Sequence, residues 1–330
     1  MTTYKEVNGT AVQSLANNTG TIEGQIWYDT ANNLFKLETA TTAGAWATGG
    51  SMPVATQQAS GCGTQTAAIM SGGNTGSDVA TSLKYDGSAW TSTGSLNTAQ
   101  TLSSSAGEQT AALIFAGRPN PVTTQTESYD GSVWSILPAT LNSTDVGRIG
   151  FGIQTAALTA GGQLNGPPWA SQANTESYDG SVWSSVNSLN TANNSAGGVG
   201  IQTAGLICFG QIPPGRTANT ESWDGTCWAA VNSANTARSN RLGSAGIQTA
   251  AIAYGGALPP NAAADATELW DGTCWTTTTS LSVARAQLGS AGTQTAALAA
   301  GGGVDPGIKK ADVEEFLGAG TATTVTLTTT

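Results

Sequence analysis

Apolar residues in this chain come in short runs that are closed by glycine and separated by Thr, Ser and Asn. The segment 249–254 ends at Gly255-Gly256, and the segment 267–270 is followed by the turn pair Asp271-Gly272. Short runs of this kind with regular turn signals predict β-strands in a sandwich, a barrel or a propeller. The chain is therefore expected to be all-β.

The runs belong to a repeat of roughly 46 residues, the period range of propeller blades. The tetrad Gln-Thr-Ala-(Ala/Gly) begins at Gln65, Gln109, Gln154, Gln202, Gln248 and Gln294. An aromatic-Asp-Gly turn follows five of the tetrads, at Tyr85, Tyr129, Tyr178, Trp223 and Trp270. Tryptophan stands five residues after each of these aromatics, at Trp90, Trp134, Trp183, Trp228 and Trp275. This period selects a propeller among the all-β folds.

Each repeat predicts four strands, here called a to d. Strand a is rich in small residues, as in 243–246, which lets the innermost strands converge near the axis. Strand b ends at the glycines, strand c ends at the aromatic, and strand d carries the tryptophan. The Asp-Gly pair is expected to form a two-residue hairpin turn between c and d.

The sixth repeat lacks its last strand. Phe316 takes the aromatic position, but neither Asp-Gly nor tryptophan follows it. Trp46 precedes the first tetrad as Trp90 precedes the second, so the N-terminal segment is predicted to supply strand d of the last blade. Such closure removes open strand edges. We expect a six-bladed propeller over residues 44–318, with four strands per blade.

The double glycine followed by a spaced Tyr and Trp resembles the kelch repeat. The pattern departs from it where Gly117 and Gly210 stand alone and where Trp223 and Trp270 replace tyrosine. The resemblance implies a kelch-like propeller. It leaves the function open, because propellers of this kind include oxidases, scaffolds and sugar binders.

Charge and composition narrow the classes of function. The chain carries 11 Lys and Arg against 21 Asp and Glu, a net charge of −10, which argues against a nucleic-acid partner. It contains no histidine, the commonest general base and metal ligand. No apolar run is long enough to span a membrane, and Met1–Thr10 has no signal-peptide features. We expect no cofactor and no catalytic metal, and leave a surface Ca²⁺ site open.

The recurring acidic residues are expected to serve the fold. The glutamates at one blade position are Glu127, Glu176, Glu221 and Glu268. The turn aspartates are Asp86, Asp130, Asp179, Asp224 and Asp271, residues that favour turns. Cys227 and Cys274 share one motif position with Val133 and Val182, and are expected to be small buried apolar residues. We therefore predict that the protein is not an enzyme.

Residues that break the repeat are better candidates for binding. The b–c loops differ in length and carry prolines, and Trp169 in one of them lies outside the repeat pattern. Strand alternation places the b–c and d–a connections on one face of the ring and the Asp-Gly turns on the other. The first face should carry every arginine. The candidate residues for binding a partner or a glycan are Arg118, Trp169, Arg216, Arg238, Arg241 and Arg285, with Arg148 on the same side.

Segments outside the ring predict a separate attachment. Residues 1–43 contain two alternating runs around 29–33, expected as a hairpin, with Trp27, Tyr28 and Phe35 as candidate anchoring residues. Residues 319–330 are expected to form an extended strand or arm. The opening Gly-Gln-Ile-Trp-Tyr-Asp-Thr at 24–30, ahead of a Thr/Ser/Asn-rich propeller, resembles tail and fibre-associated virion proteins of marine bacteriophages.

That resemblance implies a structural protein of the virion tail or fibre, made in the host cytoplasm without a signal peptide. Its partners would be other virion proteins, a host-surface glycan or a host receptor, and homo-oligomerisation in the particle stays open. The alternatives are a cellular kelch-type interaction scaffold and a phage depolymerase that acts on glycans.

Overall fold

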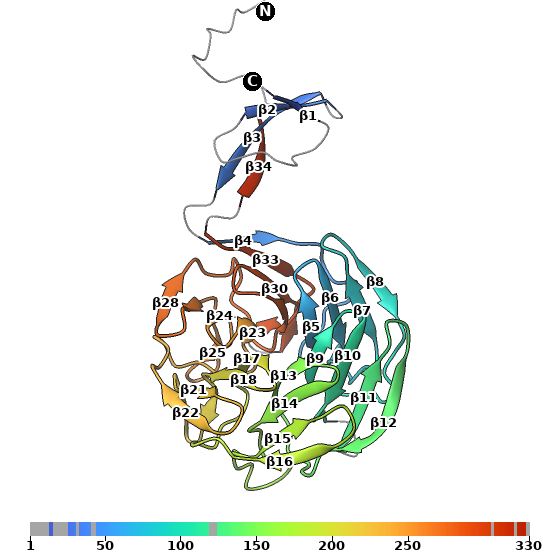
Figure 1. The fold of residues 1–330 in the computed structure, drawn as a ribbon, viewed down its shortest axis with the longest axis vertical. Coiled ribbons are helices and arrows are strands. Elements are labelled where there is room, and N and C mark those ends of the chain that lie inside the picture. Colours follow the sequence, from blue (N-terminus) through green and yellow to red (C-terminus); the bar gives the residue numbers. More distant parts are fainter. Residues whose placement is uncertain are drawn as a thin grey trace, which may run out of the picture. The chain divides into compact units, whose positions relative to one another are not determined.

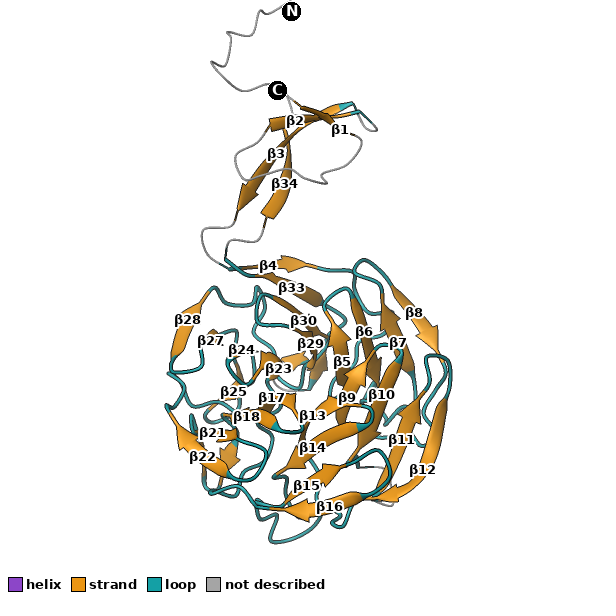
Figure 2. Ribbon diagram, viewed as in Figure 1, coloured by secondary structure: helices purple, strands orange, loops and turns teal. Residues whose placement is uncertain are grey.

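The computed structural model describes residues 13–15, 26–30, 33–40, 44–118, 124–304, 307–319 and 322–327. These residues form strands and turns without a helix (Figure 2). They divide into two compact units, one of residues 1–45 with 317–330 and the other of residues 46–316. The larger unit is a ring of four-stranded antiparallel sheets around a central axis (Figure 1).

Six sheets make up the ring. Blade 1 contains β5 (Ser60–Thr64), β6 (Ala67–Ser71), β7 (Ser82–Tyr85) and β8 (Trp90–Thr93). Blade 2 contains β9 (Ser104–Glu108), β10 (Ala111–Phe115), β11 (Gln125–Tyr129) and β12 (Trp134–Thr140). Blade 3 contains β13 (Ile149–Ile153), β14 (Ala156–Ala160), β15 (Thr175–Tyr178) and β16 (Trp183–Val186).

The other three blades follow the same plan. Blade 4 contains β17 (Gly197–Ile201), β18 (Ala204–Cys208), β21 (Thr220–Trp223) and β22 (Trp228–Val231). Blade 5 contains β23 (Gly243–Ile247), β24 (Ala250–Tyr254), β27 (Thr267–Trp270) and β28 (Trp275–Thr278). Blade 6 contains β29 (Gly289–Gly292), β30 (Ala296–Ala300), β33 (Val313–Leu317) and β4 (Ala45–Thr48).

Strand β4 closes the ring as the incomplete sixth repeat predicts. It pairs with β33, so blade 6 is built from both ends of the chain. The Trp46 ring lies 4.8 Å from Tyr254 and 5.2 Å from Phe316, centroid to centroid. Its indole Nε1 donates to Thr267 Oγ1 at 3.0 Å, which links blade 6 to blade 5. The predicted six-bladed propeller with N-terminal closure is confirmed.

Residue size follows the distance from the axis. The inner strands β5, β9, β13, β17, β23 and β29 contact one another in a closed circle. Small side chains allow this approach: a Cβ on Gly61 of β5 would lie 2.7 Å from the backbone oxygen of Ser290 in β29. The large rings of strands c and d instead fill the space between blades, as where Tyr129 and Trp134 of blade 2 pack in one cluster with Ile69 of blade 1.

The glutamine of each tetrad joins its blade to the one before. Its Nε2 donates at 2.5–2.8 Å to the backbone carbonyl of the strand c aromatic residue in the preceding blade. The pairs are Gln65–Phe316, Gln109–Tyr85, Gln154–Tyr129, Gln202–Tyr178, Gln248–Trp223 and Gln294–Trp270. The tetrad that repeats in the sequence therefore supplies the hydrogen bonds that join adjacent blades.

The Asp-Gly turns differ from the two-residue hairpins expected from the sequence. Tyr85 pairs with Trp90, so the turn holds four residues, 86–89. Only Gly87 has a positive φ, at 92°. Asp86 instead uses its Oδ1 to accept from the backbone N–H groups of Ser88 and Ala89, at 2.8 and 2.7 Å. The expectation was wrong because the side-chain acceptor, rather than a positive φ at Asp, shapes the turn.

Small ribbons in the b–c loops were not expected from the sequence. They pair β19 (Gln211–Ile212) with β20 (Gly215–Arg216), β25 (Ala257–Leu258) with β26 (Ala262–Ala263), and β31 (Gly303–Val304) with β32 (Ile308–Lys309). Each has only two residues per strand, too short for periodicity to reveal. They belong to blades 4, 5 and 6, and they give these loops a fixed backbone.

The smaller unit is a sheet in the order β1-β2-β3-β34. It contains β1 (Gln13–Leu15), β2 (Ile26–Asp29), β3 (Leu34–Ala40) and β34 (Ala322–Leu327). Strands β2 and β3 form the expected hairpin, with Asp29 opposite Leu34. Strand β34, near the C-terminus, pairs with β3 along its whole length, from Phe35 opposite Leu327 to Ala40 opposite Ala322. The N-terminal and C-terminal segments thus share one sheet.

Removing the closing tryptophan should open the ring. We expect Trp46→Ala to lower the free energy of unfolding by about 2–3 kcal/mol, less than for a fully buried tryptophan because Trp46 is only partly buried. Urea unfolding followed by tryptophan fluorescence measures the change. Trp169→Ala, in an exposed loop, is the matched control and should change the midpoint little. Equal midpoints for Trp46→Ala and the wild type would contradict the closure.

The turn aspartates should make stability depend on pH. Backbone hydrogen bonds lower the pKa of Asp86, Asp130, Asp179, Asp224 and Asp271 below the ordinary value of 3.8. Because the folded-state pKa is lowered, the charged form stabilises the fold above the pKa of the unfolded chain. This stabilisation is lost as the pH falls through the folded-state pKa.

A variant with all five aspartates changed to asparagine keeps the side-chain acceptor and loses the charge. Its melting temperature should fall less between pH 7 and pH 3 than that of the wild type. Thermal melts of both proteins at the two pH values provide the comparison. An equal fall in both would show that the turn carboxylates do not carry the acid sensitivity.

Candidate contact surface and central channel

Trp169 lies on a b–c loop of blade 3 that is closed by its own hydrogen bonds. Leu164 N donates to Ala170 O at 3.0 Å, and Trp169 N donates to Gly166 O at 2.8 Å. The Trp169 side chain is 49% exposed. The loop therefore presents the indole to solvent, and no packing requirement of the blade explains a large apolar group there.

Two further candidates lie on the same face of the ring. Arg118 is exposed at the end of a bridge with Thr101, and residues 119–123 of its loop lie outside the described residues. Arg216, in β20, donates from Nε to Ser239 Oγ at 2.8 Å and from Nη2 to Asn261 Oδ1 at 2.7 Å. Arg216 thus joins the blade 4 ribbon to the blade 5 loops. Partial burial lowers the pKa of its guanidinium.

The prediction that Arg238 and Arg285 bind a partner or a glycan is wrong, because both side chains are fully buried. Arg238 forms an ion pair with Glu268 at 2.9 Å, and Arg285 forms one with Glu314 at 2.7 Å. Arg148 does the same with Glu176 at 2.8 Å. These arginines lie on the face of the ring predicted from the sequence, since each also bonds backbone carbonyls of the b–c region in its blade. Their side chains, however, point inward.

The recurring glutamates have the structural role expected of them. Each accepts a hydrogen bond from a backbone N–H in the d–a connection of the preceding blade. The pairs are Glu127–Asn97, Glu176–Asn142, Glu221–Asn190, Glu268–Asn235 and Glu314–Ser282, at 2.7–2.9 Å. These carboxylates are committed to the seams between blades.

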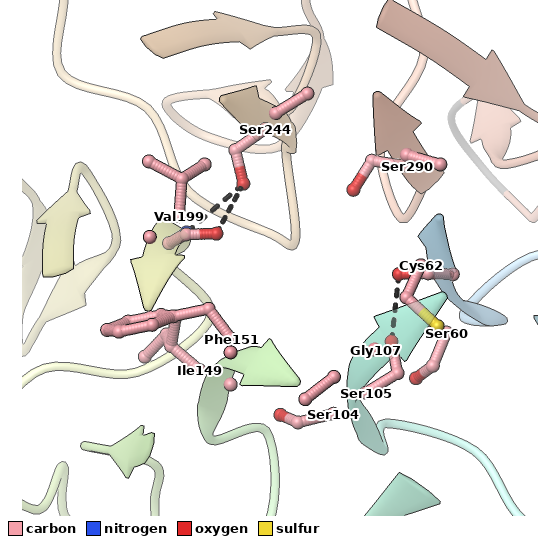
Figure 3. A pocket seen from close by; sticks show the side chains of 18 of the residues that line it. Ser60, Cys62, Ser104, Ser105, Gly107, Ile149, Phe151, Val199, Ser244 and Ser290 are labelled. Atoms are coloured by element: carbon pink, nitrogen blue, oxygen red, sulfur yellow. Dashed lines mark hydrogen bonds between the residues drawn. The ribbon is translucent and has the colours of Figure 1, made fainter. Parts of the chain in front are cut away.

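The inner strands enclose a central channel of about 280 Å³ (Figure 3). Glycine, alanine and serine supply most of its wall, with Cys62, Phe151 and Val199 as larger members. Several of the serines, Ser105 and Ser244 among them, bond the backbone of the adjacent inner strand. Burial and the nearby Glu108 raise the pKa of Cys62 to about 12, so this thiol is neutral.

Arg241 lies at the end of the channel on the b–c and d–a face. Its Nη2 donates to Ser103 O at 2.6 Å. Arg241 precedes the inner strand of blade 5 and Ser103 precedes that of blade 2, the opposite blade in a ring of six. The side chain therefore spans the channel mouth, which the sequence could not reveal.

Cys227 and Cys274 are exposed, so their predicted burial is wrong. Both occupy the third position after the turn aspartate, where the backbone N–H caps the carboxylate and the side chain points to solvent. Val133 and Val182, at the same position, are each 52% exposed. Cys62 is partly buried and Cys208 buried, and all four thiols are free.

The candidate anchoring residues divide into buried and exposed ones. Trp27 is 2% exposed, so it cannot make a direct surface contact in the small sheet. Phe35 is 46% exposed, and its ring lies 5.1 Å from that of Tyr28. Phe35 and Tyr28 therefore remain as the anchoring candidates of this unit.

Among the residues that the structure describes, no three Cys, Asp or Glu side chains gather so as to hold a metal ion. The same residues include no helix of the length and apolarity needed to cross a membrane.

Comparison with known proteins bears on the fold. No protein-family model matches the sequence, and no curated protein matches it. The chain is similar to the solved structure titled "Structure of YjhT", with a TM-score of 0.65 and 15% identity. The match covers 80% of this chain and 95% of that chain. The shared fold is a six-bladed β-propeller. At this identity the likeness shows the fold alone.

Breaking one buried ion pair should destabilise the ring. Arg238→Met leaves Glu268 buried without its cation, and we expect the free energy of unfolding to fall by about 3–5 kcal/mol. The double variant Arg238→Met/Glu268→Gln should recover part of this loss. Urea unfolding measures both, with Arg216→Met as the control in a more accessible arginine. A loss no larger than that of the control would contradict the structural role.

Proposed function

We propose that this protein is a non-catalytic binding module of a phage virion, attached to the tail or fibre. The observation that carries the binding role is Trp169, half exposed on a loop that its own hydrogen bonds hold in place. An ordered aromatic side chain lowers the entropic cost of association and is a typical hot spot of an interface. Arg216 and Arg118 add positive charge to the same face.

The non-catalytic part of the proposal rests on where the carboxylates are used. The recurring glutamates accept hydrogen bonds across the blade seams, and three of them pair with buried arginines. The turn aspartates accept backbone hydrogen bonds. With no histidine in the sequence, a pair of catalytic carboxylates would have to come from the 11 Asp and Glu residues outside these two sets.

The virion part of the proposal rests on the N-terminal segment. Its opening at 24–30 resembles tail and fibre-associated virion proteins, and residues 1–45 with 317–330 form a unit of their own. We propose that this sheet attaches the protein to the particle, with Phe35 and Tyr28 as contacts. The propeller face with Trp169 then meets a neighbouring virion protein or the host surface.

Two measurements test this proposal. Mass spectrometry of purified particles should detect the protein at a fixed copy number relative to known tail components. Trp169→Ala and Arg216→Ala should each weaken binding of the purified protein to host cells or to particles that lack it by at least tenfold, with an unchanged melting temperature. Absence from particles would refute the virion role, whereas wild-type binding by both variants would refute the contact surface.

A further inference from the structure

Blade 5 departs from the repeat at the channel mouth by one inserted residue. In blade 6, Gln287 and Leu288 separate the bridge residue Ala286 from Gly289, the first residue of its inner strand. In blade 5, three residues, 240–242, separate the bridge residue Ser239 from Gly243. Blades 1 to 4 follow the shorter pattern of blade 6.

The insertion is held in an uncommon backbone conformation. Each of the other blades places one residue with positive φ at this point, and blade 5 places two in succession, Asn240 at 67° and Arg241 at 55°. Neither is glycine, and a left-handed conformation costs such residues free energy, so it usually persists where it serves a purpose. Here it brings the Arg241 side chain across the channel mouth to Ser103.

Arg241 differs from the other buried arginines in having no counter-charge. Arg148, Arg238 and Arg285 each pair with a glutamate within 2.9 Å. Among the described residues, Arg241 forms no ion pair, and its one guanidinium hydrogen bond goes to a neutral carbonyl. An uncompensated charge in a partly buried position is unfavourable unless something outside the chain balances it.

Two polar atoms at this mouth lack hydrogen-bond partners. The Arg241 Nε is buried without an acceptor, a feature it shares with Arg148, Arg238 and Arg285, and the Oγ of Ser103 is buried without any partner. Burial lowers the pKa of Arg241 to about 10, so the guanidinium is still charged at neutral pH. The mouth therefore offers one positive charge, while the fully buried Ser103 contributes its backbone carbonyl.

The remaining channel wall favours a polar and uncharged ligand body. The Oγ atoms of Ser105 and Ser244 already donate to backbone carbonyls of adjacent inner strands, as the dashed lines in Figure 3 show, and as hydroxyl oxygens they can still accept hydrogen bonds. Two other charged residues line the channel. The Arg148 side chain is fully buried and paired with Glu176, whereas Glu108 ends the inner strand of blade 2 and so lies at the opposite mouth. An anionic group is thus attracted at the Arg241 end and repelled at the other.

We propose that the Arg241 mouth of the channel binds the carboxylate of a small acidic sugar, of the uronic acid class. A planar carboxylate matches a single guanidinium in charge and shape, whereas a doubly charged phosphate would call for a second cation. The hydroxyl groups of the sugar ring would face the serine-lined wall, and a cavity of about 280 Å³ is of the size that takes one such unit. This site is separate from the Trp169 loop and does not depend on the virion role.

The test titrates the purified protein with glucuronate and, as a matched neutral probe, with glucose. Isothermal titration calorimetry or saturation-transfer NMR should detect binding of glucuronate and at least tenfold weaker binding of glucose. Arg241→Gln, which removes the charge and keeps a polar side chain, should weaken glucuronate binding at least tenfold. Lys310→Ala, which removes a cation that lies outside the channel and pairs with Asp312, should bind glucuronate as the wild type does.

Melting temperatures of both variants show whether the ring is intact. Arg241→Gln should melt no lower than the wild type, because it removes an uncompensated charge. Failure of the wild type to bind glucuronate, or equal binding by Arg241→Gln, would overturn the proposal. Inorganic phosphate that binds more tightly than glucuronate would overturn the assignment to carboxylates. None of these outcomes bears on particle or cell binding through Trp169.

Discussion

The seam between adjacent blades is the constraint on which the rest of this structure depends. A single blade cannot satisfy its own polar groups: the tetrad glutamine of one blade caps strand c of the preceding blade, and the blade glutamate holds the preceding d–a connection. The apolar clusters also straddle the seams, as where Val199 and Leu206 of blade 4 pack with Trp270 of blade 5. Stability is therefore a property of the closed ring, which explains why the chain brings its first and last segments together in one blade.

In different blades, different side chains bond the backbone carbonyl that follows strand b. Asn193 Nδ2 donates to Phe209 O at 2.7 Å, and Arg238 Nη1 donates to the equivalent carbonyl of the next blade, Gly255 O, at 2.8 Å. The arginine extends further and also pairs with its glutamate, which the asparagine cannot do. The backbone geometry is constant while the polar side chain varies. An alignment of the repeats therefore predicts the blade and leaves the role of each arginine open.

This explains which parts of the molecule the sequence could predict. Features that recur in every repeat, such as the tetrad glutamines and the blade tryptophans, revealed the fold, and Trp46 was identified because one tryptophan was missing from the count. Arg238 and Arg285 were misread because an arginine near a loop is ordinarily exposed. Their burial depends on a glutamate about 30 residues further on, across two strands, and on the direction in which each side chain leaves the backbone. The order of residue types along the chain shows neither the pairing with this glutamate nor the direction of the side chain.

The one-residue insertion before Gly243 illustrates what a repeat protein can add without disturbing its seams. Gln287 N still bonds Asn240 O, and Arg241 N still bonds Ser195 O, so the links to blades 6 and 4 survive the extra residue. The added length is taken up by two left-handed residues, and its one visible consequence is a guanidinium across the axis of the ring. Arg241 adds a charge that the fold does not need, in the one blade that has the inserted residue. For this reason Arg241 points to a ligand more strongly than the arginines that follow the repeat.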